Sequence, residues 1–558
     1  MSAKYRNLLA VVALFFCSMI LFTWGLSAQE VFGFDSRFYF FVKEMWQYGT
    51  SWFPMTYHHP YPDYPATSTV LIYLFALLLG GINKFVVVLP SAILAASTLT
   101  FTYLIGALHH KRWGLYAVLF MLLTITFLKS ARSISLDMYP TLITACCFYL
   151  IYTADRKCKP LRVWWIYPLL ILSFAFRGPI GLVIPAGVIC SYYLLNGQLR
   201  KLFFIGLILS LLLIVCTGIL LALSYQVGGE TFMQRVLCME VLGRINNHYL
   251  SRYFYFIDSV GSYALVFPLS WFVLFGVFFY FFTARDYFSE IRLLLKLFGW
   301  MMVILVGMSI PDDKKIRYIL PMLPAVALIA AYPFVAPSSQ KYFIVIRWIL
   351  LRTFLLFPLI FLVATTYVSL YVKWHLLNIH FNYLYLNFFY VITQVINILI
   401  FYHIDRESIF DIGLSHYCKR TLCETAILCI AVLIFAITYI AVIEPIQLYI
   451  DRARDFVVAV EAQRIQQHAR LVFYKERPDG LPIKYMINMK STDQPLFVRN
   501  QNDLITFSAP AYFVASESYF NDLSKHIAAH FHVIAKDTLG HVKVVVFTRS
   551  EGVPPIVI

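Results

Sequence analysis

Apolar runs long enough to cross a membrane recur along this chain as far as residue 446. A spanning helix needs roughly 20 apolar residues, because each residue adds about 1.5 Å against a hydrocarbon core of about 30 Å. Only 13% of the 558 residues are charged and 60% are hydrophobic, whereas soluble domains carry about 25% charged residues. We therefore expect an α-helical polytopic membrane protein with about thirteen transmembrane helices. The predicted spans are 7–28, 86–108, 113–129, 133–153, 162–175, 178–195, 201–224, 263–283, 292–309, 316–335, 343–371, 384–403 and 424–446.

Basic residues in the loops predict the orientation of these spans. The net charge is +16, and the Lys and Arg residues lie in short loops, which favours lipid headgroups over nucleic acid as their partners. Clusters at 109–112, 156–162 and 200–201 fall on the cytoplasmic side if residues 66–82 form an interfacial helix. The N-terminus is then cytoplasmic and the C-terminus external. The first run is long and lacks a small-x-small cleavage site, so we expect an uncleaved span there.

Composition divides the chain near residue 446. Residues 1–446 form the predicted transmembrane domain, whose outer loops 29–85 and 225–262 are expected to form the active site. Residues 447–558 carry more charge, with a helical pattern at 451–468, another near 517–528, and short alternating runs typical of strands. Those runs are 470–474, 483–489, 511–516, 530–535 and 541–548. We expect these residues to form a small soluble periplasmic α/β domain. Its histidines do not have the spacing of metal ligands. No Asn-x-Ser/Thr sequon occurs, which favours a bacterial inner (plasma) membrane.

Two acidic residues at the outer membrane edge are candidates for catalysis. Asp35 precedes a strongly aromatic stretch with a helical pattern. A carboxylate in such surroundings suits a general base with a raised pKa, or it caps the following helix. Asp137 stands at the outer start of a span, near Lys129 and Arg132. It either organises the site as a second acid or serves as a cap or ion pair at a helix end.

Cationic residues on the predicted outer side are candidates for binding an anion. Arg177 has apolar sequence on both sides, and it either snorkels to the membrane surface or clamps an anion. Lys314, Lys315 and Arg317 form a dense cluster that opposes the orientation rule. A phosphate held at the outer face would account for these residues, and a solvated loop is the alternative.

The outer loop 225–262 offers further polar candidates. Glu240 and Arg244 are four residues apart, so they can pair on a helix. His248 together with Asp63 could bind a divalent metal ion, since imidazole and carboxylate are common ligands.

Several weak motifs occur in an order and spacing that resemble the GT-C class of membrane glycosyltransferases. Within that class the chain looks like the family of protein O-mannosyltransferases and lipid A aminoarabinose transferases, over about residues 1–340. The motifs are Asp35 with Glu44-Met45 and Gly49, Tyr61-Pro62-Asp63-Tyr64-Pro65, Ser135-Leu136-Asp137, Arg177-Gly178-Pro179 with Gly181 and Pro185, Gln234-Arg235, Glu240, His248, 253–255, Phe267-Pro268, Lys315, Tyr318, Pro321 and Pro324. Ser36, Tyr64 and Ala66 depart from the family pattern, and the segment to Met45 is one residue shorter. These departures bear on the aminoarabinose substrate more than on the reaction class.

The resemblance implies an inverting transfer of a sugar from a polyprenyl-phosphate (undecaprenyl-phosphate) donor at the outer face of the inner membrane. Asp35 would be the base and Asp137 would support it. Expected donor or phosphate ligands are Arg37, Lys129, Arg132, Arg177, Arg244, Lys315, Arg317 and Tyr318, with Glu240 and Tyr61 as acceptor or loop residues and Asp63 and His248 as metal ligands. A divalent metal ion is an optional cofactor. No nucleotide cofactor is expected, because the donor arrives already activated and no Gly-rich nucleotide loop is present.

Other functions also fit parts of the sequence. A transporter or lipid flippase would place charges within spans, but we find no paired repeats, and the charges cluster at one face. An assembly protein would leave Asp35, Asp137 and the basic cluster unexplained. An O-antigen-ligase-like enzyme would use a diphosphate-linked donor. Lipid A or a related glycolipid is the preferred acceptor, with protein or another envelope glycan as alternatives, and we expect a monomer.

Overall fold

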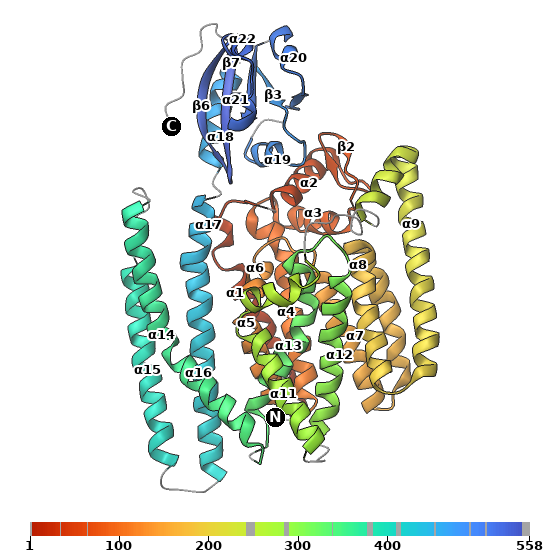
Figure 1. The fold of residues 1–558 in the computed structure, drawn as a ribbon, viewed down its shortest axis with the longest axis vertical. Coiled ribbons are helices and arrows are strands. Elements are labelled where there is room, and N and C mark those ends of the chain that lie inside the picture. Colours follow the sequence, from red (N-terminus) through yellow and green to blue (C-terminus); the bar gives the residue numbers. More distant parts are fainter. Residues whose placement is uncertain are drawn as a thin grey trace. The chain divides into compact units, whose positions relative to one another are not determined.

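Long apolar helices make up most of the chain, and a small mixed sheet follows them (Figure 1). The computed structural model describes residues 3–33, 35–63, 65–240, 251–283, 289–337, 339–375, 383–408, 414–450, 453–489, 493–507 and 510–549. It divides into two units, which are described separately below. The first contains residues 1–24 and 91–443, and the second contains residues 25–90 and 444–558.

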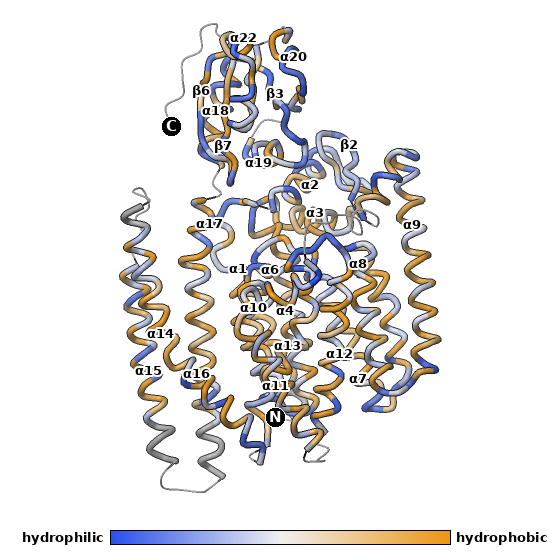
Figure 2. Tube along the Cα trace, in the orientation of Figure 1, coloured by the Kyte–Doolittle hydropathy of each residue, from blue (hydrophilic) through white to orange (hydrophobic). Residues whose placement is uncertain are grey.

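The described residues of the first unit form helices and the turns and loops that connect them. Apolar side chains dominate these helices along their lengths, as Figure 2 shows. The helices are α1 (Ala3–Thr23), α4 (Lys84–Ala107, whose first turns belong to the second unit), α5 (Lys111–Leu122), α6 (Ile125–Ala131), α7 (Met138–Arg156), η2 (Pro160–Trp165), α8 (Ile166–Leu195), α9 (Leu199–Glu240), α10 (Phe254–Ser262), α11 (Val266–Thr283), α12 (Ser289–Ser309), η4 (Ile316–Met322), α13 (Leu323–Ala331), η5 (Tyr332–Phe334), α14 (Lys341–His375), α15 (Leu384–Ser408), α16 (Leu414–Thr438) and η6 (Tyr439–Ile443).

The chain is a polytopic helical membrane protein, as the sequence predicts. Within the described residues nine helices are long and apolar enough to cross a membrane, or up to eleven if each of two sharply bent helix pairs counts as one span. This range counts Pro160–Leu195 once, although its backbone breaks at Gly178 and Ser173 bonds the Gly181 carbonyl, which agrees with the turn predicted between the spans 162–175 and 178–195. Segment 66–82 contains α3 (Thr67–Leu79), whose 13 residues are too few for a span.

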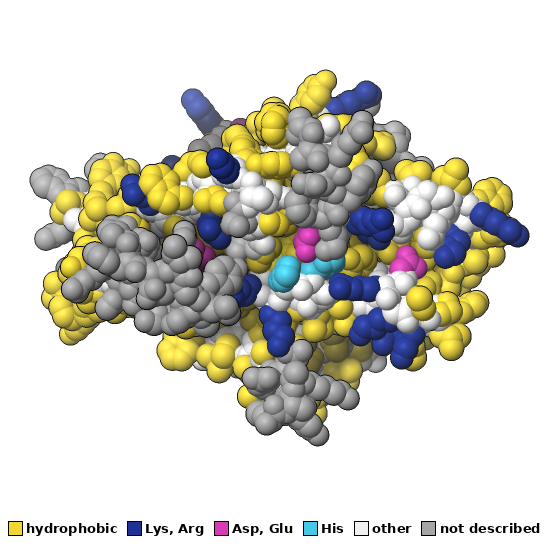
Figure 3. Space-filling model, turned by 90° about the horizontal axis from the view of Figure 1, so that it is seen from below, with side chains coloured by type: hydrophobic (Ala, Val, Ile, Leu, Met, Phe, Trp, Pro, Cys, Tyr) yellow, Lys and Arg dark blue, Asp and Glu magenta, His cyan; other side chains and the backbone are white. Residues whose placement is uncertain are grey.

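One face of the first unit carries many basic side chains (Figure 3). The turns that contain the predicted cytoplasmic clusters lie close together, because His109 lies 2.6 Å from the Tyr152 hydroxyl and Arg156 donates to the Leu108 carbonyl. The hydroxyl of Tyr192, near the end of α8, donates to Asp155 over 2.7 Å. Three loops that are separate in sequence thus meet at one end of the helices, as the charge pattern predicts.

The second unit joins an N-terminal segment to the C-terminal domain. Its N-terminal elements are η1 (Leu26–Ala28), α2 (Asp35–Tyr48), the hairpin of β1 (Met55–Thr56) and β2 (His59–Pro60), and α3. Its C-terminal elements are α17 (Glu444–Ile450), α18 (Arg454–Gln466), β3 (Arg470–Tyr474), α19 (Leu481–Met486), β4 (Leu496–Val498), α20 (Gln501–Thr506), β5 (Ala511–Ser516), α21 (Glu517–Asn521), α22 (Lys525–Ala528), β6 (Phe531–Leu539) and β7 (Val542–Arg549).

The C-terminal domain is built on a five-stranded mixed sheet of order β4-β3-β5-β7-β6. Strands β3, β4 and β5 run parallel, while β7 pairs antiparallel with β5 and β6. Both faces of β5 are buried, which explains its apolar run. The predicted strand at 483–489 is wrong, because this segment contains α19, and the three-residue strand β4 was missed. The remaining predicted strands are confirmed within a few residues.

Candidate active site

A buried carboxylate joins three separate helical segments of the first unit. Asp137 is 3% exposed and occupies the N-cap position of α7, but its side chain makes no capping hydrogen bond. Instead, its Oδ1 accepts from Arg177 Nε on α8 over 2.8 Å, and its Oδ2 lies 3.2 Å from Arg317 Nε on η4. Arg177 is 4% exposed, so its guanidinium is buried in this pair. Because the ion pair links α7, α8 and η4, it fixes their relative positions.

A glycine-proline break in α8 positions Arg177. Gly178 has φ 64° and ψ −154°, a conformation available almost only to glycine, and Pro179 disfavours helical geometry in the residue before it. The helix therefore kinks directly after Arg177. The ring of Phe176 stacks on that of Tyr139 at 4.0 Å between centroids, which holds the kink against the start of α7.

Tyr318 lies at the centre of the cationic cluster. Its ring is 5.4 Å from the Arg177 guanidinium carbon, 5.9 Å from Lys315 Nζ and 6.0 Å from the Arg317 guanidinium carbon. Its hydroxyl donates to Asp313 over 3.2 Å. The buried aromatic ring gathers the cations and keeps them from separating.

Buried aromatic side chains hold η4, the segment that carries these cations. The hydroxyl of Tyr263 donates to the Ile316 carbonyl over 3.0 Å, and that of Tyr255 bonds both the carbonyl and the amide of Lys315 over 3.3 Å. The indole of Trp300 donates to the Pro321 carbonyl over 2.9 Å. Carbonyls and amides that a helix would satisfy internally are thus satisfied by side chains, so the segment keeps a fixed shape.

Lys314, the neighbour of Lys315 in sequence, carries a buried charge. The residue is 4% exposed, and its ammonium nitrogen is buried without a hydrogen-bond partner among the described residues. A buried ammonium is costly unless it is paired. An anionic ligand would supply the missing partner.

Other predicted ligands of the first unit have different surroundings. Arg132 is buried and donates to the carbonyls of Leu21, Phe22 and Trp24 at the end of α1, contacts that satisfy free helix carbonyls. Lys129 is exposed at the end of α6, and Glu240 is buried at the end of α9. The predicted Arg244 lies outside the described residues.

The second unit holds the remaining candidates. Asp35 is the first residue of α2 and is 7% exposed. The Arg37 guanidinium carbon lies 5.5 Å from the ring of Tyr61. Tyr61 packs on Phe41 at 5.3 Å, and its carbonyl accepts the amide of buried Asp63 over 2.8 Å. The aromatic helix that was predicted to follow Asp35 thus fixes the Tyr61-Pro62-Asp63 segment.

The predicted metal ligands do not form a recognisable site in the part of the chain that the structure describes. There, no group of three or more His, Cys, Asp or Glu residues could hold a metal ion. Asp63 is buried, whereas its predicted partner His248 lies outside the described residues. The metal site therefore stays a prediction, and no chemical step below depends on it.

Sequence reasoning found the charged members of the cluster and missed the residues that hold them. Asp137, Arg177, Lys315, Arg317 and Tyr318 were predicted, and the structure brings them together. The contacts of Asp313, Tyr255 and Tyr263 were not predicted. Tyr255 and Tyr263 belong to a generally aromatic stretch of sequence, and no spacing rule connects them to η4.

The chain is a membrane protein whose fold is of the GT-C class. The solved structures that it resembles are those of ArnT from Cupriavidus metallidurans, in the apo state and bound to undecaprenyl phosphate. The TM-scores are 0.64 and 0.62, each with 16% sequence identity and 98% of both chains covered. This similarity establishes the fold.

Sequence comparisons identify a more limited relationship. No protein-family profile matches the chain. An uncharacterised protein from Aquifex aeolicus (strain VF5) is 29% identical over 303 residues, which are 52% of this chain and 56% of that protein. The chain thus spans little more than half the length of this curated relative.

Proposed function

We propose that this protein transfers a sugar from a polyprenyl-phosphate donor to an acceptor in the cell envelope. The observation that carries the proposal is the buried ammonium of Lys314, which has no hydrogen-bond partner in the described chain and lies in the same short segment as Lys315 and Arg317. A phosphate is the anion that such a set of cations binds well. The ArnT structure with undecaprenyl phosphate has the same fold, which supports a lipid-linked phosphate as the ligand.

The proposed reaction is a substitution with inversion at the anomeric carbon. Asp35 accepts the proton of an acceptor hydroxyl or phosphate while that oxygen attacks the carbon. The bond between this carbon and the donor phosphate oxygen breaks, and its electrons leave with the polyprenyl phosphate. Negative charge therefore grows on the phosphate, and fixed cations directed at it lower the barrier. Lys314, Arg177 and Arg317 take this role, and Asp137 holds the two arginines in position.

Lipid A or a related glycolipid is the preferred acceptor, and the reaction takes place at the outer face of a bacterial inner membrane. Helices that cross the membrane would give a lipid-linked donor access to the protein from within the bilayer, which supports this proposal. A hydroxyl group on a protein, as in protein O-mannosylation, is the alternative acceptor.

The test is mass spectrometry of lipid A, other envelope glycans and envelope proteins from cells that carry the wild type or Asp35→Asn. Membrane abundance is matched, and Asp503→Asn serves as the control because Asp503 is an exposed acid on α20 of the C-terminal domain. We expect one sugar mass to disappear from one class of molecule in Asp35→Asn and to persist in the control. The class that loses the mass identifies the acceptor.

Two other results would redirect the proposal. Loss of a sugar from proteins alone would replace lipid A by a protein acceptor. Identical profiles in all three strains, with each protein folded and abundant, would refute Asp35 as the base and favour transport.

A further inference from the structure

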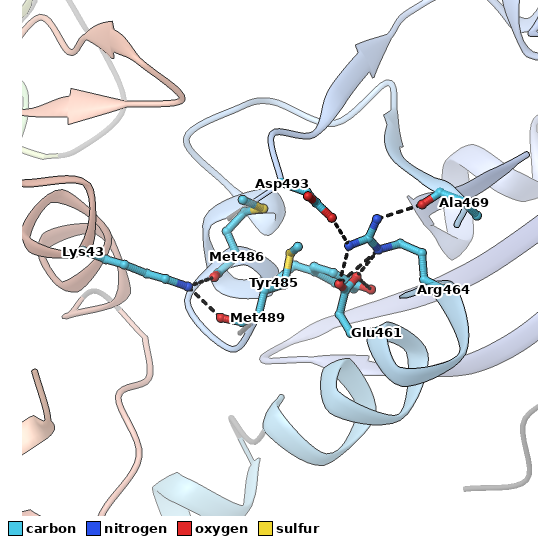
Figure 4. Close-up of polar contacts among 8 residues, drawn as sticks. All are labelled: Lys43, Glu461, Arg464, Ala469, Tyr485, Met486, Met489 and Asp493. Carbon is cyan, nitrogen blue, oxygen red and sulfur yellow. Dashed lines mark hydrogen bonds and ion pairs between the residues drawn. The ribbon is translucent and has the colours of Figure 1, made fainter. Parts of the chain in front are cut away.

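A lysine on α2 reaches the C-terminal domain within the second unit. Lys43 Nζ donates to the carbonyl of Met486 over 2.9 Å and to that of Met489 over 2.7 Å (Figure 4). These carbonyls lie at and just beyond the end of α19, where a helix lacks internal donors. A cation placed there adds a charged donor to these carbonyls and interacts favourably with the negative end of the helix. The contact joins segments that are more than 440 residues apart in sequence.

Buried charges make α19 a fixed support for this lysine. The hydroxyl of Tyr485 on α19 donates to Glu461 over 3.1 Å. Glu461 also accepts from Arg464, whose other nitrogens donate to the Ala469 carbonyl over 2.7 Å and to Asp493 over 2.7 Å (Figure 4). Tyr485, Glu461 and Arg464 are each 5% exposed or less. A fully satisfied buried network of this kind is rigid.

Apolar contacts attach the same helix to the same domain. Phe40 lies three residues before Lys43 and is buried in the core of the C-terminal domain. Its ring is 5.1 Å from that of Tyr57, which contacts Phe497 at 5.2 Å and donates through its hydroxyl to the Pro478 carbonyl over 2.9 Å. Helix α2 therefore contacts the domain through both a charged group and a ring.

The turn between β1 and β2 adds a strained connection. Tyr57 and His58 have φ values of 51° and 62°, which non-glycine residues adopt at a cost. The strain is compensated, because Tyr57 packs into the domain core and the His58 amide donates to Glu44 of α2 over 3.2 Å. The hairpin thus links α2 to the domain directly before the Tyr61-Pro62-Asp63 segment.

We propose that Lys43 is a positioning residue through which the C-terminal domain sets the orientation of Asp35. This inference rests on the proposed function of Asp35. Eight residues separate the two, about 12 Å along a helix, so Lys43 does not touch the reacting atoms. A tilt of roughly 5° at Lys43 would displace Asp35 by about 1 Å, an error that can cost up to about a hundredfold in rate. The domain therefore supports catalysis without contributing a reacting group.

The test compares Lys43→Met, which keeps the length of the side chain and removes its charge, with Lys43→Arg, which can still donate to both carbonyls. Transfer is measured as the sugar-modified fraction of the acceptor at equal membrane abundance. Binding of undecaprenyl phosphate to each purified full-length protein is measured in parallel. We expect Lys43→Met to lower transfer about tenfold with unchanged binding. Amide exchange of α2 should rise in the same variant, and Lys43→Arg should restore both transfer and protection.

The possible failures can be told apart. Full transfer by Lys43→Met in a background where Asp35→Asn is inactive would overturn the positioning role and leave the proposed function intact. Parallel loss of transfer and of undecaprenyl phosphate binding would also overturn it, because general destabilisation would then suffice. No change of transfer with either Lys43→Met or Asp35→Asn would refute both proposals.

Discussion

At the scale of single residues, the proposed function requires a guanidinium at position 177. The Nε of Arg177 donates to Asp137 over 2.8 Å, and a phosphate would be a further partner of the planar group. Lysine carries the same charge as a single point and lacks this fork. The identity of the residue therefore matters as well as its charge.

We expect Arg177→Lys to weaken undecaprenyl phosphate binding about tenfold to a hundredfold, because one charge-assisted hydrogen bond contributes about 1.5–3 kcal/mol. The measurement is the dissociation constant for undecaprenyl phosphate in the purified protein. Arg156→Lys is the matched control, since Arg156 is the last residue of α7, at the end remote from Asp137. Equal affinity in Arg177→Lys and wild type would contradict a phosphate-binding role.

At the scale of elements, the kink in α8 determines where Arg177 points. Gly178 has a backbone conformation that L-residues adopt only at a cost of about 1–3 kcal/mol. A side chain there would either strain this turn or displace the two helical halves that meet at it. Displacement of the first half would move Arg177 relative to Asp137.

Gly178→Ala should therefore lower both thermal stability and the affinity for undecaprenyl phosphate. Gly187→Ala in the same helix is the control, because its new methyl group would meet only Val303 at an ordinary 3.4 Å. Unfolding midpoints in one detergent and binding of undecaprenyl phosphate give the two readouts. A Gly178→Ala protein as stable and as tightly binding as Gly187→Ala would show that the kink is dispensable.

The helices and strands also show which parts of the fold the sequence could predict. The apolar runs, strand β3 and strand β5 were found because burial leaves a local pattern. The assignment of 483–489 failed because a six-residue helix with mixed apolar residues has no reliable period. Long-range contacts leave no local pattern in the sequence. Lys43 is a single charged residue in an aromatic helical segment, and its neighbours in sequence do not indicate that it binds the Met489 carbonyl.

The same distinction holds for the candidate site. Arg177, Lys315 and Arg317 could be found because charge in apolar or outer segments needs a reason. Which carboxylate they surround, and which rings hold them, depends on the packing of helices that are far apart in sequence. The sequence therefore predicts which charged residues belong to the cluster better than it predicts which residues they contact.

At the scale of the whole molecule, the orientation in the membrane can be tested with cysteines. Cys158 is exposed in the basic turn between α7 and η2, on the predicted cytoplasmic side. We expect a membrane-impermeant maleimide to label it in inside-out vesicles and not in intact spheroplasts. An added Asp503→Cys in the C-terminal domain should show the opposite accessibility.

Other cysteines contribute background, so labelling is compared with Cys158→Ser in each preparation. If the maleimide labelled Cys158 from outside and labelled Asp503→Cys only from inside, the topology would be the reverse of the predicted one. The predicted donor phosphates would then have to lie at the cytoplasmic surface.

The Asp137 ion pairs also constrain how this protein can change during evolution. Loss of the carboxylate alone removes the anion that both arginines contact, and loss of Arg177 alone removes one of the two cations that contact the buried carboxylate. Breaking a buried pair from one side costs about 3–5 kcal/mol, a large part of the stability of most proteins. We therefore expect a single substitution in this group to lower stability, and the three residues to change together among related sequences, although they lie on segments as distant as α7 and η4.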